Sequence, residues 1–291
     1  MNRIKKLVYA AGLAMGMAGG AQAADIVFIV DESGSMGGEH AWLSSMVTSL
    51  ETELVAAGET ANNYGLVGYG ASSSHGIDGH AHTVGSGDWG TAAALASATS
   101  GLFTSGGTED GWQAIDYALN HYAWSGGPIN FILVTDEDRD NRDASLSYAS
   151  VLSDLNGRGV VLNSVINVSL RDGTGAVAVG VDGDNPANAY IADGMGGYTS
   201  ATGGTATGGY GTSVANYAEL AWATGGAAWD LNQLRAGGLT AASFTAAFVD
   251  IKVQEIIEQT GSVPEPASLA LMGIGLLGMG FGRKVIKSRI R

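Results

Sequence analysis

The chain has 291 residues, a formal net charge of −14 and no cysteine. Without cysteine a disulfide framework is excluded, so a hydrophobic core must supply the stability. Residues 24–264 hold six basic and 27 acidic side chains, a net charge of −21, which argues against nucleic acid or an anionic membrane as a partner.

The first 23 residues are typical of a secretory signal peptide. Three basic residues precede an apolar stretch that begins at Leu7, and Ala21-Gln22-Ala23 forms a small-residue cleavage motif. A membrane anchor is the alternative, but glycines interrupt the apolar stretch and it is short for a span. We therefore predict export across the inner membrane and a mature chain that begins near Ala24.

Apolar runs alternate with helical repeats along the middle of the chain. Strands are predicted where the apolar run is continuous, at Ile26 to Val30, Tyr64 to Tyr69, Phe131 to Val134, Val160 to Val168 and Ala227 to Leu231. Helices are predicted where apolar residues repeat every three or four positions, from Trp42, at Trp112 to Tyr122, Leu146 to Leu155 and Phe244 to Ile257. This alternation predicts one α/β domain over residues 24–260, with a doubly wound, mostly parallel six-stranded sheet and helices on both faces.

The segment from Arg171 to Gly211 interrupts this alternation. It contains 12 glycines in 41 residues and has no sustained period. Such a length is unusual for a simple connection, so we expect either a functional loop or a loosely ordered insertion. Because it follows a parallel strand, it leaves from the carboxyl edge of the sheet, where open α/β folds bind their ligands.

Oxygen-bearing side chains converge on the same edge from three segments. Asp31, Ser33 and Ser35 follow the first strand, and residues two apart in extended chain point the same way. Thr108 stands just before the Trp112 helix, and Asp136 ends the Phe131 strand. Two carboxylates and three hydroxyls suit Mg²⁺, with Mn²⁺ or Ca²⁺ as alternatives, and leave one position for water or a partner.

These motifs also carry a family resemblance. The segments DESGS, GGT and VTDED, in this order, resemble the metal-ion-dependent adhesion site of von Willebrand factor type A domains, and the likeness extends from Asp25 to about Gln259. It implies a Rossmann-like fold, a divalent cation at Asp31, Ser33, Ser35, Thr108 and Asp136, and an acidic protein or polysaccharide as ligand. The glycine-rich insertion departs from the compact family pattern. A structural surface or matrix protein without metal chemistry is the alternative function.

The last 31 residues, 261–291, form a three-part tail. Pro264-Glu265-Pro266 is followed by sixteen uncharged residues from Ala267 to Gly282 and then by a basic cluster. Physically this is a short membrane anchor whose basic end stays in the cytoplasm. The order of its parts resembles the PEP-CTERM sorting signal of Gram-negative bacteria. That resemblance implies a transient anchor, removal by an exosortase-type protease, and a final location at the cell surface or in the extracellular matrix.

Two further patterns in the sequence suggest other chemistry. His75, His80 and His82 lie in SSSHGIDGHAH, with His40 near the first loop; they suit a transition metal, but a solvated polar loop is the preferred interpretation. The stretch SGSMG lacks one glycine of a hydrolase nucleophile elbow, because Ser33 stands in its place. The last histidine, His121, precedes Asp136, so a hydrolase triad in that order is excluded and we expect a binding module rather than an enzyme.

Overall fold

The computed structural model describes residues 23–71, 74, 76, 78–184 and 187–260. The predicted signal peptide up to residue 22, the predicted sorting tail and His75 lie outside these residues. Within the described ranges, no helix combines the length and the apolar character that a membrane span requires.

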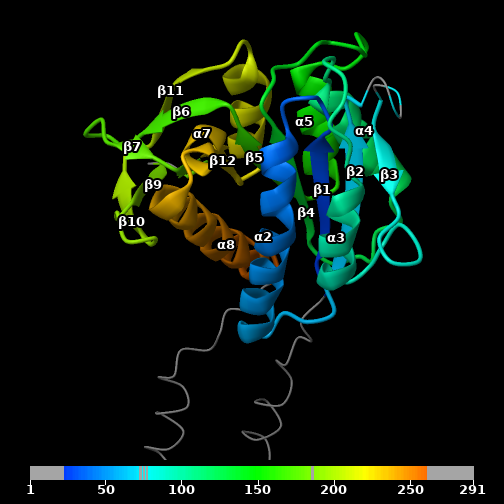
Figure 1. The fold of residues 1–291 in the computed structure, drawn as a ribbon, viewed down its shortest axis with the longest axis horizontal. Helices are drawn as coiled ribbons and strands as arrows, with labels where there is room; N and C mark the ends of the chain where they lie inside the picture. Colours follow the sequence, from blue (N-terminus) through cyan, green and yellow to red (C-terminus); the bar gives the residue numbers. More distant parts are fainter. Residues whose placement is uncertain (1–22, 72–73, 75, 77, 185–186, 261–291) are drawn as a thin grey trace, which may run out of the picture.

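A nine-stranded sheet runs through the middle of the molecule (Figure 1). Its core is parallel, in the order β12 (Ala227–Asp230), β5 (Val160–Ile166), β4 (Ile129–Thr135), β1 (Asp25–Asp31) and β2 (Asn63–Tyr69). Antiparallel strands flank this core, β3 (His80–His82) beside β2, and β8 (Gly180–Asp182), β9 (Asn188–Ala192) and β10 (Tyr198–Thr202) beyond β12. The predicted α/β class is confirmed, whereas the predicted count of six strands is too low.

Of the four strands in this sheet that no predicted run covers, β8, β9 and β10 come from the glycine-rich insertion, whose described residues form paired strands instead of a loose loop. Besides β8, β9 and β10, it contributes to a separate three-stranded sheet of β6 (Val168–Arg171), β7 (Val177–Ala178) and β11 (Thr205–Gly209). These strands pair through backbone N–H and C=O groups, which every residue here except proline carries. Backbone pairing needs no periodic pattern of side chains, so the glycine-rich sequence showed no sign of these strands.

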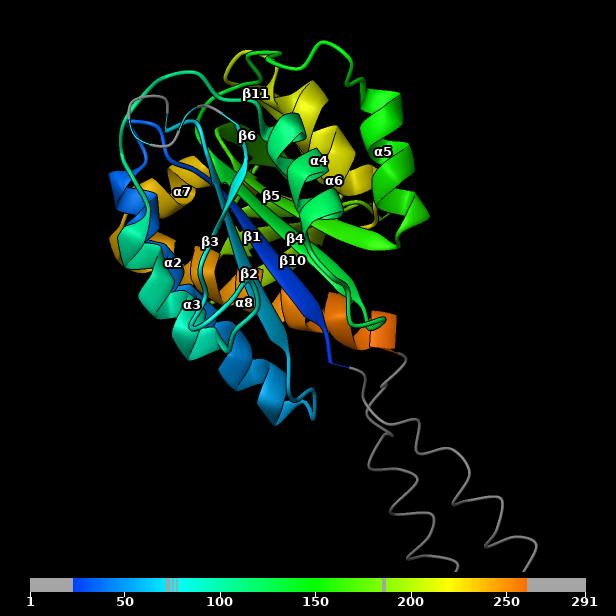
Figure 2. The ribbon, with the colours of Figure 1, turned by 90° about the vertical axis from the view of Figure 1, so that its right-hand side faces the viewer.

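Helices cover both faces of the sheet (Figure 2). One face carries α2 (Gly37–Ala56), α3 (Ala92–Ala98) and α8 (Gly238–Thr260), and the other carries α4 (Gly111–His121), α5 (Tyr148–Gly157) and α6 (Glu219–Ala223). Short helical turns at Thr99–Gly101 and Val214–Ala218, and α7 (Leu231–Arg235), complete the fold.

β1 shows why the central strands read as unbroken apolar runs. All seven of its residues are buried. Phe28 and Val30 pack in the core on the α2 and α8 side, whereas Val27 and Ile29 pack in the core on the α4 and α5 side. A strand buried on both faces needs apolar residues at successive positions rather than at alternate ones.

The register of the parallel core brings the strand ends together at one edge. Asp31 of β1 is paired with Tyr69 of β2, and Val30 is paired with Val134 of β4. The segments that follow β1 and β4 therefore leave the sheet side by side. This carboxyl edge lies at the top in Figure 1.

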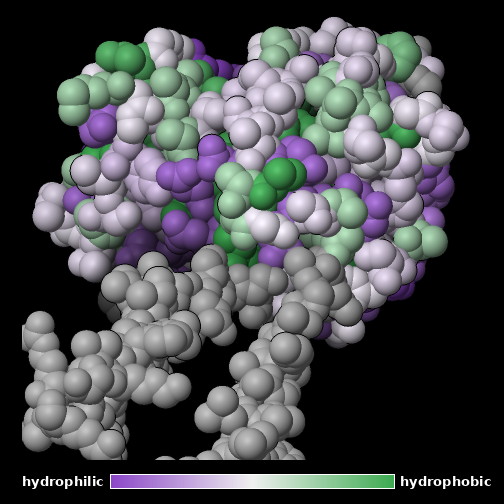
Figure 3. Space-filling model, turned by 90° about the horizontal axis from the view of Figure 1, so that it is seen from below, coloured by the Kyte–Doolittle hydropathy of each residue, from purple (hydrophilic) through white to green (hydrophobic). Residues whose placement is uncertain are grey.

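Both ends of the described chain lie at the opposite edge of the sheet. The Ala24 carbonyl oxygen accepts from the Asn63 amide at the start of β2, at 2.9 Å. At the end of α8, the Thr260 hydroxyl donates to Glu59 Oε1 at 2.9 Å, just before that same strand. Figure 3 looks at this side, where hydrophilic and weakly polar residues mix with small, separate hydrophobic areas.

Candidate functional site

Asp31 stands at the end of β1 with its carboxylate fixed by neighbours. Oδ1 accepts from the Ser33 amide at 2.7 Å, and Oδ2 accepts from the Thr135 hydroxyl at 2.8 Å. Burial raises the pKa of Asp31 to about 7, and the charge of Asp136 adds to the rise although the two hydrogen bonds oppose it. A cation at this edge favours the ionised carboxylate, because opposite charge stabilises the charged form.

A chain of hydrogen bonds joins the first loop to the third. The Ser33 and Ser35 hydroxyl oxygens lie 3.2 Å apart, and the Ser35 hydroxyl donates to Asp136 Oδ1 at 2.9 Å. Ser33 and Asp136 are buried, whereas Ser35 is exposed. The structure therefore links Ser33, Ser35 and Asp136 through their side chains, with the buried Asp31 carboxylate beside them, and Ser35 reaches solvent.

Thr108, the fifth predicted ligand, is half-buried in the second loop. Backbone hydrogen bonds tie that loop to the first, from Gly34 to the Gly106 carbonyl at 3.2 Å and from Ser105 to the Glu32 carbonyl at 2.9 Å. Among the described residues, no hydrogen bond joins the Thr108 side chain to the other four candidates. The segment is placed as expected, and ligation by its hydroxyl stays a prediction.

Gly70 lets the second loop approach Asp31 closely. Its φ is +82°, and a Cβ there would stand 3.2 Å from Asp31 Oδ1 and 3.7 Å from the Thr108 carbonyl oxygen. A side chain at this position would crowd the carboxylate and would also strain the backbone.

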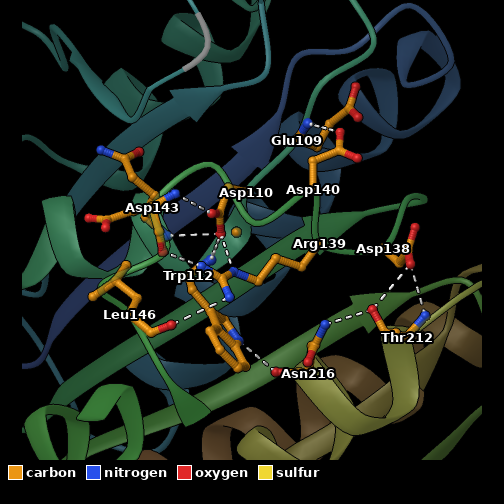
Figure 4. Close-up of polar contacts among 12 residues, drawn as sticks. Glu109, Asp110, Trp112, Asp138, Arg139, Asp140, Asp143, Leu146, Thr212 and Asn216 are labelled. Carbon is orange, nitrogen blue, oxygen red and sulfur yellow. Dashed lines mark hydrogen bonds and ion pairs between the residues drawn. The ribbon is translucent and has the colours of Figure 1, made fainter.

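The second and third loops are clamped together beside the site (Figure 4). The Glu109 amide donates to Asp140 Oδ2 at 2.9 Å, and the Asp140 amide donates to the Glu109 carbonyl at 2.8 Å. Arg139 donates to Asp110 Oδ1 at 2.7 Å while its guanidinium lies 4.3 Å from the centre of the Trp112 ring. This part-buried clamp fixes the segment that carries Thr108 relative to the one that carries Asp136.

The edge is strongly acidic, and the pKa of Glu109 shows the effect of the neighbouring charges. Glu109 is buried, and burial together with the charges of Asp31, Glu137, Asp140 and, less strongly, Asp136 raises its pKa to about 8. So many carboxylates in one place create a negative potential that attracts cations.

One residue at the site was not predicted from the sequence. Arg235, at the end of α7, donates through Nη2 to Asp136 Oδ2 at 2.7 Å and through Nε to Glu39 Oε1. The hydrogen bonds that Arg235 donates to Glu39 and Asp136 raise its pKa further above its ordinary value, although partial burial opposes the rise. Arg235 lies 99 positions from Asp136 in the chain, so no local motif connects them.

The histidines do not lie where the sequence interpretation placed them. His80 and His82 belong to strand β3 rather than to a solvated loop, because backbone pairing with β2 orders this segment. His40 lies in α2, with Nε2 2.8 Å from the Asp31 carbonyl oxygen. His75, the remaining histidine of that stretch, lies outside the described residues.

Comparison with known families gives two matches. A family model described as the von Willebrand factor type A domain matches residues 25–193. A second, described as the PEP-CTERM protein-sorting motif, matches residues 262–284. No curated protein matches the chain significantly.

Several solved structures are similar to parts of the chain. A von Willebrand factor type A protein from Catenulispora acidiphila is 18% identical over 50% of this chain and 33% of its own, with a TM-score of 0.36. Proximal thread matrix protein 1 from the mussel byssus, with a zinc-occupied MIDAS motif, is 16% identical over 50% of this chain and 36% of its own, with a TM-score of 0.38. The vWF domain of the pilus tip protein Mfa5 from Porphyromonas gingivalis is 22% identical over 41% of this chain and 40% of its own, with a TM-score of 0.30.

Proposed function

The chain belongs to the von Willebrand factor type A family, and on that premise we propose that it binds a divalent cation at the carboxyl edge of its sheet and engages an acidic ligand through it. The observation that carries this proposal is the hydrogen-bonded chain from Ser33 through Ser35 to Asp136, with Asp31 beside it. Hydroxyl and carboxylate oxygens from separate loops meet there, at a point that solvent reaches.

The donor set fits a hard cation. Asp31, Ser33, Ser35, Thr108 and Asp136 offer oxygen atoms alone, which favours Mg²⁺, or Mn²⁺ or Ca²⁺, over softer ions. When bound, such an ion supplies a Lewis-acidic position that accepts an oxygen of an acidic side chain or sugar. The protein supplies the orientation, because Thr135 holds Asp31 and Ser35 holds Asp136.

We also propose a route to the outside of the cell for this domain. A signal peptide at residues 1–23 directs export, residues 24–260 fold as the domain, and an exosortase-type protease removes the tail at 261–291. The match to the PEP-CTERM motif supports this arrangement. Because both ends of the described chain lie at the amino edge of the sheet, the candidate site faces away from a membrane that holds the tail.

A second function is a structural surface or matrix protein without metal chemistry. Arg235 favours it, since its guanidinium already neutralises Asp136 at 2.7 Å. In this case the acidic edge would be held by an internal ion pair, and cations would bind only weakly and without a defined stoichiometry.

Calorimetric titration of the purified protein with Mg²⁺ and Mn²⁺ distinguishes the two functions. We expect one cation per chain in the wild type and no such binding in Asp31→Ala or Asp136→Ala. Asp154→Ala, an exposed acid on α5, is the matched control and should bind like the wild type. Unchanged titrations in both site variants would remove the basis of the proposal. Retention of the protein on polyglutamate or alginate beads, measured with and without chelator, then tests whether it binds an acidic ligand through the cation.

A further inference from the structure

A buried carboxylate meets two histidines on the outer side of β2. The Glu32 side chain has no exposed surface; Oε2 lies 3.0 Å from His80 Nε2, and Oε1 lies 3.1 Å from His82 Nε2. One ligand atom from each of the three residues lies within 4.8 Å of the others, the single such group of histidines and acids among the described residues. Three side chains of the types that bind metal ions therefore converge at a place distinct from the oxygen site around Asp31 and Asp136.

The strand geometry aims both imidazoles at the same carboxylate. His80 and His82 are two positions apart in β3, so their side chains project from the same side of the strand. Their ring centres lie 5.0 Å apart. The antiparallel pairing of β3 with β2 thus fixes the distance between the two imidazole rings, which a solvated loop would leave variable.

Gly68 leaves the space that the carboxylate occupies. It lies in β2 opposite His80, and a Cβ there would stand 2.3 Å from Glu32 Oε2 and 2.7 Å from His82 Nε2. Glu32 follows the end of β1 and must cross β2 to reach β3. The crossing is open because this position of β2 has no side chain.

The hydrogen bonding of His80 leaves its Nε2 directed at the carboxylate. Nδ1 lies 3.2 Å from the Asp78 carbonyl oxygen, which only accepts, so Nδ1 carries the hydrogen. In neutral His80 the lone pair of Nε2 then faces Glu32 Oε2, which requires a positive species between the two atoms. A proton or a metal ion meets this requirement, and metal-bound histidines commonly donate their other N–H to a carbonyl in this way.

The carboxylate is also held in place by a backbone amide. The Phe103 amide donates to Glu32 Oε1 at 2.8 Å. This hydrogen bond fixes the orientation of the Glu32 side chain toward the two histidines.

We propose that Glu32, His80 and His82 bind a divalent transition metal ion of the zinc class. Two imidazole nitrogens and one carboxylate oxygen are typical ligands of such an ion. Bonds of roughly 2.0–2.1 Å in a tetrahedral site place ligand atoms roughly 3.3 Å apart. Each imidazole nitrogen lies close to that distance from a different oxygen of Glu32, 3.0 Å for His80 and 3.1 Å for His82. The His80 side chain is 21% exposed and the His82 side chain is 12% exposed, so both imidazoles are partly open to solvent.

This site is independent of the proposed adhesion function. Its nitrogen ligands select a softer ion than the oxygen site does. Its ligands also differ, although Glu32 directly follows Asp31 in the sequence. A variant that loses the oxygen site can keep the Glu32, His80 and His82 site, and the reverse also holds. The two proposals can therefore be tested separately.

Co²⁺ is a suitable probe, because its visible absorption is much more intense in tetrahedral than in octahedral coordination. The purified full chain, stripped with chelator and kept in excess Mg²⁺, is titrated with Co²⁺ and then with Zn²⁺. We expect one Co²⁺ per chain with intense visible bands that Zn²⁺ abolishes. His80→Asn, His82→Asn and Glu32→Gln should each weaken Co²⁺ binding by about 100-fold or more, because losing a residue that merely orients a metal ligand already weakens metal binding by about 10- to 100-fold.

Two controls make the assignment specific. His121→Asn removes a histidine that contacts a single carboxylate, Asp88 at 3.2 Å, and should leave Co²⁺ binding unchanged. Asp136→Ala should also leave it unchanged, although Mg²⁺ binding is lost. Gly68→Ala keeps all three ligands but displaces the carboxylate, and should weaken Co²⁺ binding.

Wild-type affinity in the two histidine variants would overturn the proposal, as would loss of Co²⁺ binding in Asp136→Ala. Circular dichroism verifies that each variant is folded. If Glu32→Gln fails to fold, the histidine variants decide the question, because His80 and His82 lie on an edge strand that pairs with β2 alone.

Discussion

At the scale of single residues, Arg235 is the side chain that most affects the candidate cation site. Ser35 donates to one oxygen of Asp136 and Arg235 donates to the other. A divalent ion that binds Asp136 directly must compete with one of these donors. The guanidinium also places a fixed positive charge at the point where a cation would bind, which lowers the affinity by like-charge repulsion.

Replacing Arg235 with glutamine should therefore strengthen Mg²⁺ binding. We expect about a tenfold lower Kd, or roughly 1.4 kcal/mol, by calorimetric titration. Arg158→Gln carries the same change of charge at the end of α5, near the opposite edge of the sheet, and serves as the matched control. Weaker binding in Arg235→Gln would mean that this residue positions Asp136 for the ion instead of opposing it.

At the scale of elements, α8 is joined to the sheet by a buried polar network as well as by apolar packing. Lys252 Nζ lies 2.8 Å from Glu255 Oε2, which also accepts from Asn163 of β5 at 2.6 Å. The Trp229 indole of β12 donates to Asn163 Oδ1 at 2.8 Å. The network fixes the position of α8 against two strands, since Lys252 and Asn163 are fully buried, Glu255 is 11% exposed, and each polar group depends on its partner.

Lys252→Met should destabilise the protein in a pH-dependent way. Burial raises the pKa of Glu255 and Lys252 opposes the rise, so removing the lysine raises this pKa further. A carboxyl group whose folded pKa is raised contributes stability at low pH and loses it as the pH rises through that pKa. We expect a loss of about 3–5 kcal/mol at pH 8 and a smaller loss at pH 5, measured by urea unfolding.

The double variant Lys252→Met with Glu255→Gln separates charge from packing. It leaves no ionisable group in the network, so its stability relative to the wild type should change much less between pH 5 and pH 8. An equal loss at both pH values in the single variant would exclude burial of an unpaired Glu255 charge as the cause.

At the scale of the whole molecule, charge and polarity combine at the carboxyl edge. The segment 24–264 carries a net charge of −21, and acids from three loops gather around Asp31 and Asp136. Mutual repulsion among these charges opposes the compact state. A bound cation would relieve it, so cation binding and stability should be linked.

Mg²⁺ at about 100 times its Kd should add about 2.7 kcal/mol to the free energy of unfolding. For a domain of this size that corresponds to a rise in Tm of roughly 5–10 °C, measured by circular dichroism after removal of metals with chelator. Buffers matched in ionic strength with NaCl control for screening. A similar rise in Tm in the double variant that combines Asp31→Ala and Asp136→Ala would point to non-specific screening of the acidic surface.

The sequence by itself determined the fold class, the order of the central strands and helices along the chain, and the three segments that meet at the edge. It did so because these features are local. A doubly buried strand such as β1 must be apolar at successive positions, and a loop after a parallel strand must leave from the carboxyl edge.

Only the tertiary structure decided which distant side chains meet. Arg235 reaches Asp136, Glu32 crosses Gly68 to His80, and the glycine-rich insertion extends the sheet. These pairings depend on strand register and on the space a glycine leaves, and neither produces a periodic pattern in the chain. Contacts between residues far apart in sequence are selected by packing in three dimensions, which local composition does not encode.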